Sequence, residues 1–122
     1  SAAGFAAAKE RCAIAIEQLI IDGFTHTRDP VGHRWAPRKP PTGSWELLFK
    51  TATMFESFIV DNSGRSLKIY NRATERGRPY PLFHQRGTVY MPARKMLPDK
   101  YLSPKWRAEL RRVTALALAE LR

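Results

Sequence analysis

The chain has 122 residues with 21 Lys and Arg against 11 Asp and Glu, which gives a formal net charge of +10 and a pI near 10.4. A chain of this length builds one modest hydrophobic core and not two, so we expect a single domain over residues 1–122. The hydrophobic fraction of 43% excludes a disordered basic tail, and the single Cys12 excludes an internal disulfide. The longest apolar stretch, 13–21, is interrupted by Glu17 and Gln18 and is too short to cross a bilayer, so no membrane partner is expected.

The positive charge is concentrated in the C-terminal half. Residues 65–112 hold thirteen of the basic side chains and only three of the acidic ones. This half should attract phosphates or an acidic protein surface, although a merely solubilising surface is the alternative. The residues expected to face a polyanion are Arg72, Arg76, Arg78, Arg86, Lys95, Arg107, Arg111 and Arg112.

The first predicted element is an amphipathic helix over residues 2–23. Apolar residues that include Phe5, Cys12 and Ile16 recur at three- and four-residue steps, and Gly23 stands where a C-terminal cap would. Because Cys12 lies on the apolar stripe, we interpret it as a small core residue rather than a nucleophile.

Residues 25–43 contain four prolines and two glycines, a composition that prevents regular structure over most of the segment. We therefore expect an extended arm or a loop. Its Trp35 has two alternative roles: the indole inserts into an apolar site on a neighbouring molecule, or it folds back on its own core.

The middle of the chain predicts a β-hairpin after a short helix over 44–51. Residues 54–60 are rich in Phe, Ile and Val, and residues 66–70 alternate between apolar and polar. The connecting residues 61–65 favour a turn in which Gly64 takes a positive φ.

Residues 71–98 are divided by four prolines and two glycines, so we expect short pieces that include a helical turn over 80–85 and a strand over 88–91. A second helix follows, with Ser103 as N-cap, Pro104 at the first helical position and Trp106 beginning the apolar stripe. The predicted fold class is thus α+β: a long N-terminal helix and a C-terminal helix packed on a small, mostly antiparallel sheet, with an extended proline-rich arm.

The sequence shows no pattern typical of a catalytic, cofactor or metal site. The histidines have no metal-ligand spacing with Cys12 or the acidic residues, and no phosphate-binding glycine loop, dinucleotide fingerprint or nucleophile elbow is present. We therefore expect no enzyme activity, no catalytic residue, no cofactor and no metal.

Three stretches, however, resemble the phage virion morphogenesis family, the tail completion proteins of tailed bacteriophages. Residues 29–37 match a segment of the form Asp-Pro-x-Gly-x-x-Trp-x-Pro; Tyr80, Phe83 and 84–87 match a His-Gln-x-Gly element after a tyrosine; and residues 92–97 match Pro-Ala-Arg followed by apolar residues. The motifs stand in the family's order. An Asp-Thr-Gly-x-Leu element usual ahead of the first hairpin strand is replaced here by residues 50–54, which lack its acid and glycine.

The resemblance implies a structural protein of the phage neck or tail end that forms a ring of its own copies, sixfold to match the tail. Its implied partners are the tail terminator or tube and the head connector, with non-specific contact to genomic DNA in the lumen. The implied location is the virion, after assembly in the host cytoplasm. A cyclic ring needs two different surfaces on each subunit.

Within this interpretation, Pro30 and Gly32 shape a turn that projects Trp35, and Arg94 anchors a carboxylate across a subunit interface. His84 and Gln85 are expected to satisfy backbone groups at a turn beside Gly87 rather than to act in catalysis. The predicted interface residues are Asp29, Pro30, Trp35, Pro37, Arg94, Met96 and Leu97. The alternative function is a small basic nucleic-acid-binding protein that uses the C-terminal helix and aromatic stacking.

Overall fold

A computed structural model of the chain describes residues 2–36, 54–74, 77, 80–87 and 93–120. The named elements are α1 (Ala2–His26), β1 (Phe58–Asp61), β2 (Lys68–Asn71), α3 (Tyr80–Arg86) and α4 (Pro104–Ala119). The α+β class is confirmed. The helix predicted over 44–51, the strand predicted over 88–91 and the second half of the arm, 37–43, lie outside the described residues.

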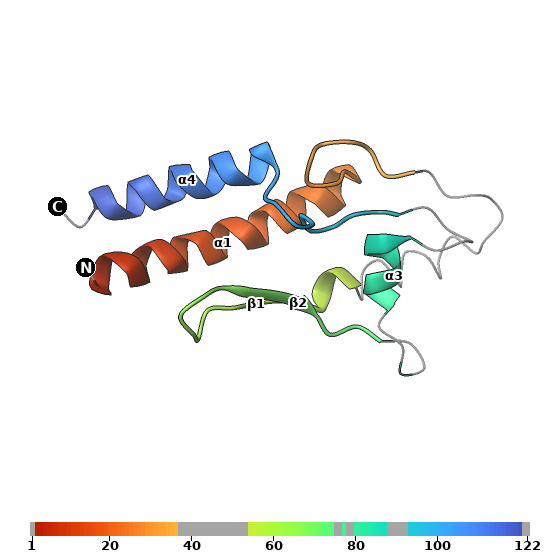
Figure 1. The fold of residues 1–122 in the computed structure, drawn as a ribbon, viewed down its shortest axis with the longest axis horizontal. Coiled ribbons are helices and arrows are strands. Elements are labelled where there is room, and N and C mark those ends of the chain that lie inside the picture. Colours follow the sequence, from red (N-terminus) through yellow and green to blue (C-terminus); the bar gives the residue numbers. More distant parts are fainter. Residues whose placement is uncertain (1, 37–53, 75–76, 78–79, 88–92, 121–122) are drawn as a thin grey trace.

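Helix α1 is the central element, with α4 along one side and the β1–β2 hairpin along the other (Figure 1). Its buried residues Ile16, Leu19 and Ile20 form the core together with Trp106 of α4. Apolar side chains of the hairpin, among them Val60 and Ile69, pack against this cluster. The helix α4 packs mainly along α1 rather than on the sheet, so α1 separates the other two layers.

Helix α1 ends three residues later than predicted. The Arg28 amide donates to the Gly23 carbonyl at 2.9 Å and the Thr27 amide to the Phe24 carbonyl at 3.4 Å, while Thr27 takes a φ of 51°. These are the two bonds of a Schellman cap with Thr27 in the left-handed position that glycine usually occupies. Gly23 is therefore inside the helix, and its prediction as the cap was wrong. Phe5, which was placed on the apolar stripe, is 59% exposed.

Helix α4 begins as its sequence predicts and runs antiparallel to α1. Ser103 is extended and its hydroxyl accepts a hydrogen bond from the Trp106 amide at 3.3 Å, with proline in the first turn. At the opposite end, the Arg11 guanidinium lies 2.5 Å from the Glu120 carboxylate. Cys12 packs between the helices with its sulfur 3.3 Å from the Thr114 hydroxyl, which agrees with a structural role.

The β1–β2 hairpin is antiparallel, with Phe58 opposite Asn71 and Asp61 opposite Lys68. Leu67 and Ile69 face the core and Tyr70 is exposed, as the alternation predicts. Two predictions here were wrong. Residues 54–56 form a helical turn, so the first strand begins only at Phe58, and Gly64 does not take a positive φ. The turn is shaped instead by the Asp61 carboxylate, which accepts hydrogen bonds from the amide and hydroxyl of Ser63; these bonds lower the pKa of Asp61.

Candidate functional site

The three segments that carry the motifs lie together at the end of the molecule away from the start of α1 and the end of α4 (Figure 1). The Trp35 indole Nε1 donates to the Lys95 carbonyl at 2.8 Å, and the Arg94 guanidinium Nε donates to the Ala36 carbonyl at 3.0 Å. The Arg94 amide donates to the His84 carbonyl at 2.6 Å. We refer to residues 27–36, 84–87 and 93–99, which these bonds join, as the motif cluster.

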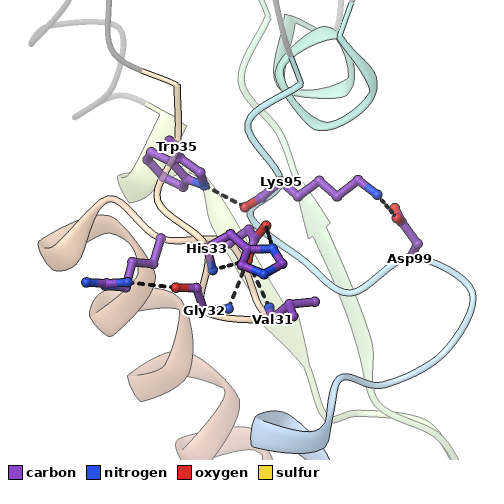
Figure 2. A network of polar contacts seen from close by, with 8 residues as sticks. Val31, Gly32, His33, Trp35, Lys95 and Asp99 are labelled. Carbon is purple, nitrogen blue, oxygen red and sulfur yellow. Dashed lines mark hydrogen bonds and ion pairs between the residues drawn. The ribbon is translucent and has the colours of Figure 1, made fainter.

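A tight turn at Asp29 organises the first segment of the motif cluster. One oxygen of the Asp29 carboxylate accepts the amides of Val31, Gly32 and His33 at 3.0, 2.9 and 2.8 Å (Figure 2). Gly32 takes a φ of 109°, which only glycine adopts without strain, and Pro30 is buried. The Asp-Pro-x-Gly part of the motif therefore forms a turn through interactions among neighbouring residues.

The turn folds the chain back instead of extending it. Of the two forms expected for residues 25–43, an arm or a loop, residues 27–36 take the loop form, and the Trp35 amide donates to the Thr27 carbonyl at 2.7 Å. The Trp35 ring stands edge-on to Phe24, with centroids 5.3 Å apart. Trp35 therefore folds back on its own chain. A contact of this residue with a neighbouring copy stays a prediction.

Gln85 holds the third segment to α3. Its side-chain oxygen accepts the amides of Met96 and Leu97 at 2.8 and 3.2 Å, and its Nε2 donates to the Leu97 carbonyl at 2.7 Å. The expectation that Gln85 satisfies backbone groups is confirmed, but these groups belong to residues 96–97 and not to the turn at Gly87.

The other predicted interface residues also have partners within the chain. Arg94 donates to a backbone carbonyl of its own chain, at Ala36, which is a different role from the predicted anchor for a carboxylate. Met96 is buried and Leu97 packs against the core. Pro37 lies outside the described residues. A contact of Arg94 with a carboxylate of a neighbouring copy stays a prediction.

A cleft of about 470 Å³ opens beside the motif cluster, between the turn at Asp29 and the segment that leads into α4. The Lys95 ammonium hydrogen-bonds the Asp99 carboxylate at its edge (Figure 2). This bond holds the pKa of Asp99 below and the pKa of Lys95 above their ordinary values, so the pair stays charged at neutral pH.

Exposed cationic side chains and exposed apolar side chains both line this cleft. Arg34 and Lys100 contribute cations, while Val31 and Tyr101 contribute exposed apolar surface, with Tyr101 73% exposed and the Lys100 ammonium 5.5 Å from its ring centre. Neither Lys100 nor Tyr101 was among the residues predicted for a site from the sequence. The available signal was an aromatic residue outside every predicted apolar stripe and next to a lysine, a pattern typical of an exposed contact site.

The residues predicted to face a polyanion are divided among several elements. Arg107 and Arg111 are exposed one turn apart on α4, and Arg72 and Arg86 are exposed after β2 and at the end of α3. Arg112 is engaged with Glu109 at 2.6 Å, a bond that lowers the pKa of that glutamate. Lys95 is paired with Asp99. Arg76 and Arg78 lie outside the described residues.

Within the described part of the chain, no group of three or more His, Cys, Asp and Glu side chains is placed to hold a metal ion. Among the same residues, no helix combines the length and the apolar character that a membrane crossing requires.

Comparisons with protein-family models, with curated proteins and with solved structures found no match to this chain. The phage-family resemblance therefore rests on the three motifs alone.

Proposed function

We propose that this chain is a structural protein of a tailed-phage neck or tail end, which forms a ring that completes the tail and helps join it to the head connector. The observation that supports the proposal is the motif cluster. Short motifs that match a family by chance are not expected to contact one another in the structure. Motifs that belong to a shared fold are expected to do so. Here Trp35 bonds to Lys95, and the residue after Trp35 bonds to Arg94, although the first and third motifs are about 60 residues apart.

The shape of the chain suits a ring. A cyclic assembly joins two different faces of each subunit, and this molecule has an elongated helical body with the motif cluster at one end (Figure 1). The excess positive charge of residues 65–112 then faces DNA in the lumen or acidic surfaces of the tail terminator, tube or connector. Non-specific contact of this kind needs charge without base readout.

The test is the mass and shape of the purified protein. Native mass spectrometry and light scattering over a wide concentration range should give a closed oligomer, and negative-stain electron microscopy should show rings, sixfold if the ring matches the tail. A protein that stays monomeric at every concentration, including under mild cross-linking, would contradict the proposal.

The alternative is a nucleic-acid-binding protein, and one observation favours it. Tyr101 is exposed beside Lys100, and α4 presents Arg107 and Arg111 nearby in sequence, an arrangement of aromatic and cationic groups typical of single-strand binding. Fluorescence anisotropy with labelled single-stranded and duplex DNA separates the two functions. Binding by a monomer, with a steep loss of affinity as salt rises, would favour the alternative; rings with weak DNA binding favour the neck protein.

A further inference from the structure

One face of α1 is exposed and carries acidic and apolar residues in alternation. Glu10, Ile14, Glu17 and Ile21 recur at three- and four-residue steps and are all exposed, with Ile14 58% and Ile21 38% accessible. This spacing puts them in one row on the side of the helix opposite its buried residues. We call these four residues the acidic row.

The cleft beside the motif cluster has the complementary character. Its two carboxylates are already engaged, since Asp29 accepts three backbone amides and Asp99 is bonded to Lys95. Within the described part of the chain, Arg34 and Lys100 have no carboxylate partner. We call Val31, Arg34, Lys100 and Tyr101 the basic cleft; it offers two cations and two exposed apolar side chains.

We propose that the acidic row of one copy docks into the basic cleft of the next copy. The inference rests on the ring proposed above and names its interface. Each glutamate would meet a cation, with Arg34 able to bind a carboxylate through two parallel hydrogen bonds, and the isoleucines would cover Val31 and Tyr101. Because the two surfaces differ, the contact is heterologous and can repeat around a closed ring.

The cleft suits a carboxylate-bearing helix face better than a nucleic-acid strand. A strand needs a series of stacking aromatics beside a track of cations. The described part of the cleft exposes only the Tyr101 ring and the His33 imidazole, because Trp35 is held against Phe24. Single-stranded DNA in the cleft is therefore an outcome for the test to detect.

Charge reversal on each surface tests the contact. The row variant is Glu10→Lys with Glu17→Lys, and the cleft variant is Arg34→Glu with Lys100→Glu. Each change places like charges together, so each variant alone should need a protein concentration roughly tenfold or more above that of the wild type for half-assembly, as measured by light scattering and native mass spectrometry. An equimolar mixture should assemble again, because the basic row of one variant fits the acidic cleft of the other and the remaining two surfaces are native.

A control reverses one exposed cation and one exposed carboxylate that belong to neither surface, Arg65→Glu with Glu56→Lys, and should assemble as the wild type does. All of the altered side chains are exposed, so circular dichroism and thermal unfolding should show native folding for every variant.

Three results would overturn the inference, and they are distinguishable. If the wild type forms rings and both variants assemble as well as it does, the interface lies elsewhere and the proposed function stands. If the wild type is monomeric, the result contradicts both the proposed interface and the proposed function. If the cleft variant assembles normally but loses binding to a labelled oligothymidine, the cleft belongs to nucleic acid and not to a second copy.

Discussion

The helical core and the motif cluster are two neighbouring regions held together by different forces. In the core, Ile16, Ile20 and Trp106 are joined by apolar contact, and α1 meets α4 and the hairpin through side-chain packing. In the motif cluster, the side chains of Gln85 and Asp29 satisfy backbone groups of segments without regular structure. Apolar packing depends mainly on volume, whereas such hydrogen bonds depend on the identity of one residue.

This difference explains where the sequence carries motifs and where it carries only periodicity. Many apolar residues can fill the stripe of α1, so the stripe indicates a helix and little more. Asp29, Gly32 and Gln85 each do something that few other residues can do, and all three stand within the motifs on which the phage-family resemblance rests.

The largest expected effect comes from breaking the core. Trp106 is 3% exposed and lies in the core cluster with the buried residues of α1, so Trp106→Ala should lower the free energy of unfolding by about 3–5 kcal/mol. Chemical denaturation of both proteins measures this. Leu116→Ala on the same helix is the control, because Leu116 is 48% exposed and should change stability little. Equal losses in the two variants would contradict the described packing of α4.

A smaller and local effect is expected from the motif cluster. Gln85→Ala leaves the amides of Met96 and Leu97 without their acceptor, which should cost about 1–3 kcal/mol. Relative to the wild type, hydrogen exchange in this variant should become faster at these two amides than it does in α1. The control Gln18→Ala removes an exposed side chain that bonds only within α1, to Asp22, and should leave both amides protected. Unchanged protection in Gln85→Ala would show that the bridge does not hold the segment.

Elements with local signals could be predicted from the sequence, and elements set by distant contacts could not. Ser103 and Pro104 mark the start of α4, because a helix cap is formed by residues that are adjacent in the sequence. Residues 54–56 look like a strand by their aromatic and apolar content, yet they form a helical turn whose Met54 carbonyl accepts the Asn71 side-chain amide at 2.6 Å, across 17 residues. Composition does not report such a contact.

The same distinction applies to the candidate site. The turn at Asp29 could be inferred because Asp, Pro and Gly act on their own backbone within four residues. The cleft could not, because it requires Trp35 to meet Lys95, a contact across 60 residues. Lys100 and Tyr101 become candidate site residues only once that contact brings their segment beside the turn.

The smallest expected effect comes from two glycines, Gly32 in the motif cluster and Gly64 in the turn of the hairpin. Nothing lies within 4 Å of a side-chain carbon built on Gly32 or on Gly64, so steric crowding is the same for both, but only Gly32 has a positive φ, of 109°. Gly32→Ala should therefore cost about 1 kcal/mol or more through backbone strain alone, while Gly64→Ala should be neutral or slightly stabilising because it restricts the unfolded chain. Thermal unfolding ranks the two variants. Because the strain falls on the turn that bounds the cleft, exchange at the Val31 and His33 amides should rise in Gly32→Ala while the amides of α1 and α4 keep their protection; faster exchange throughout the core would mean that the turn and the helices unfold as one unit.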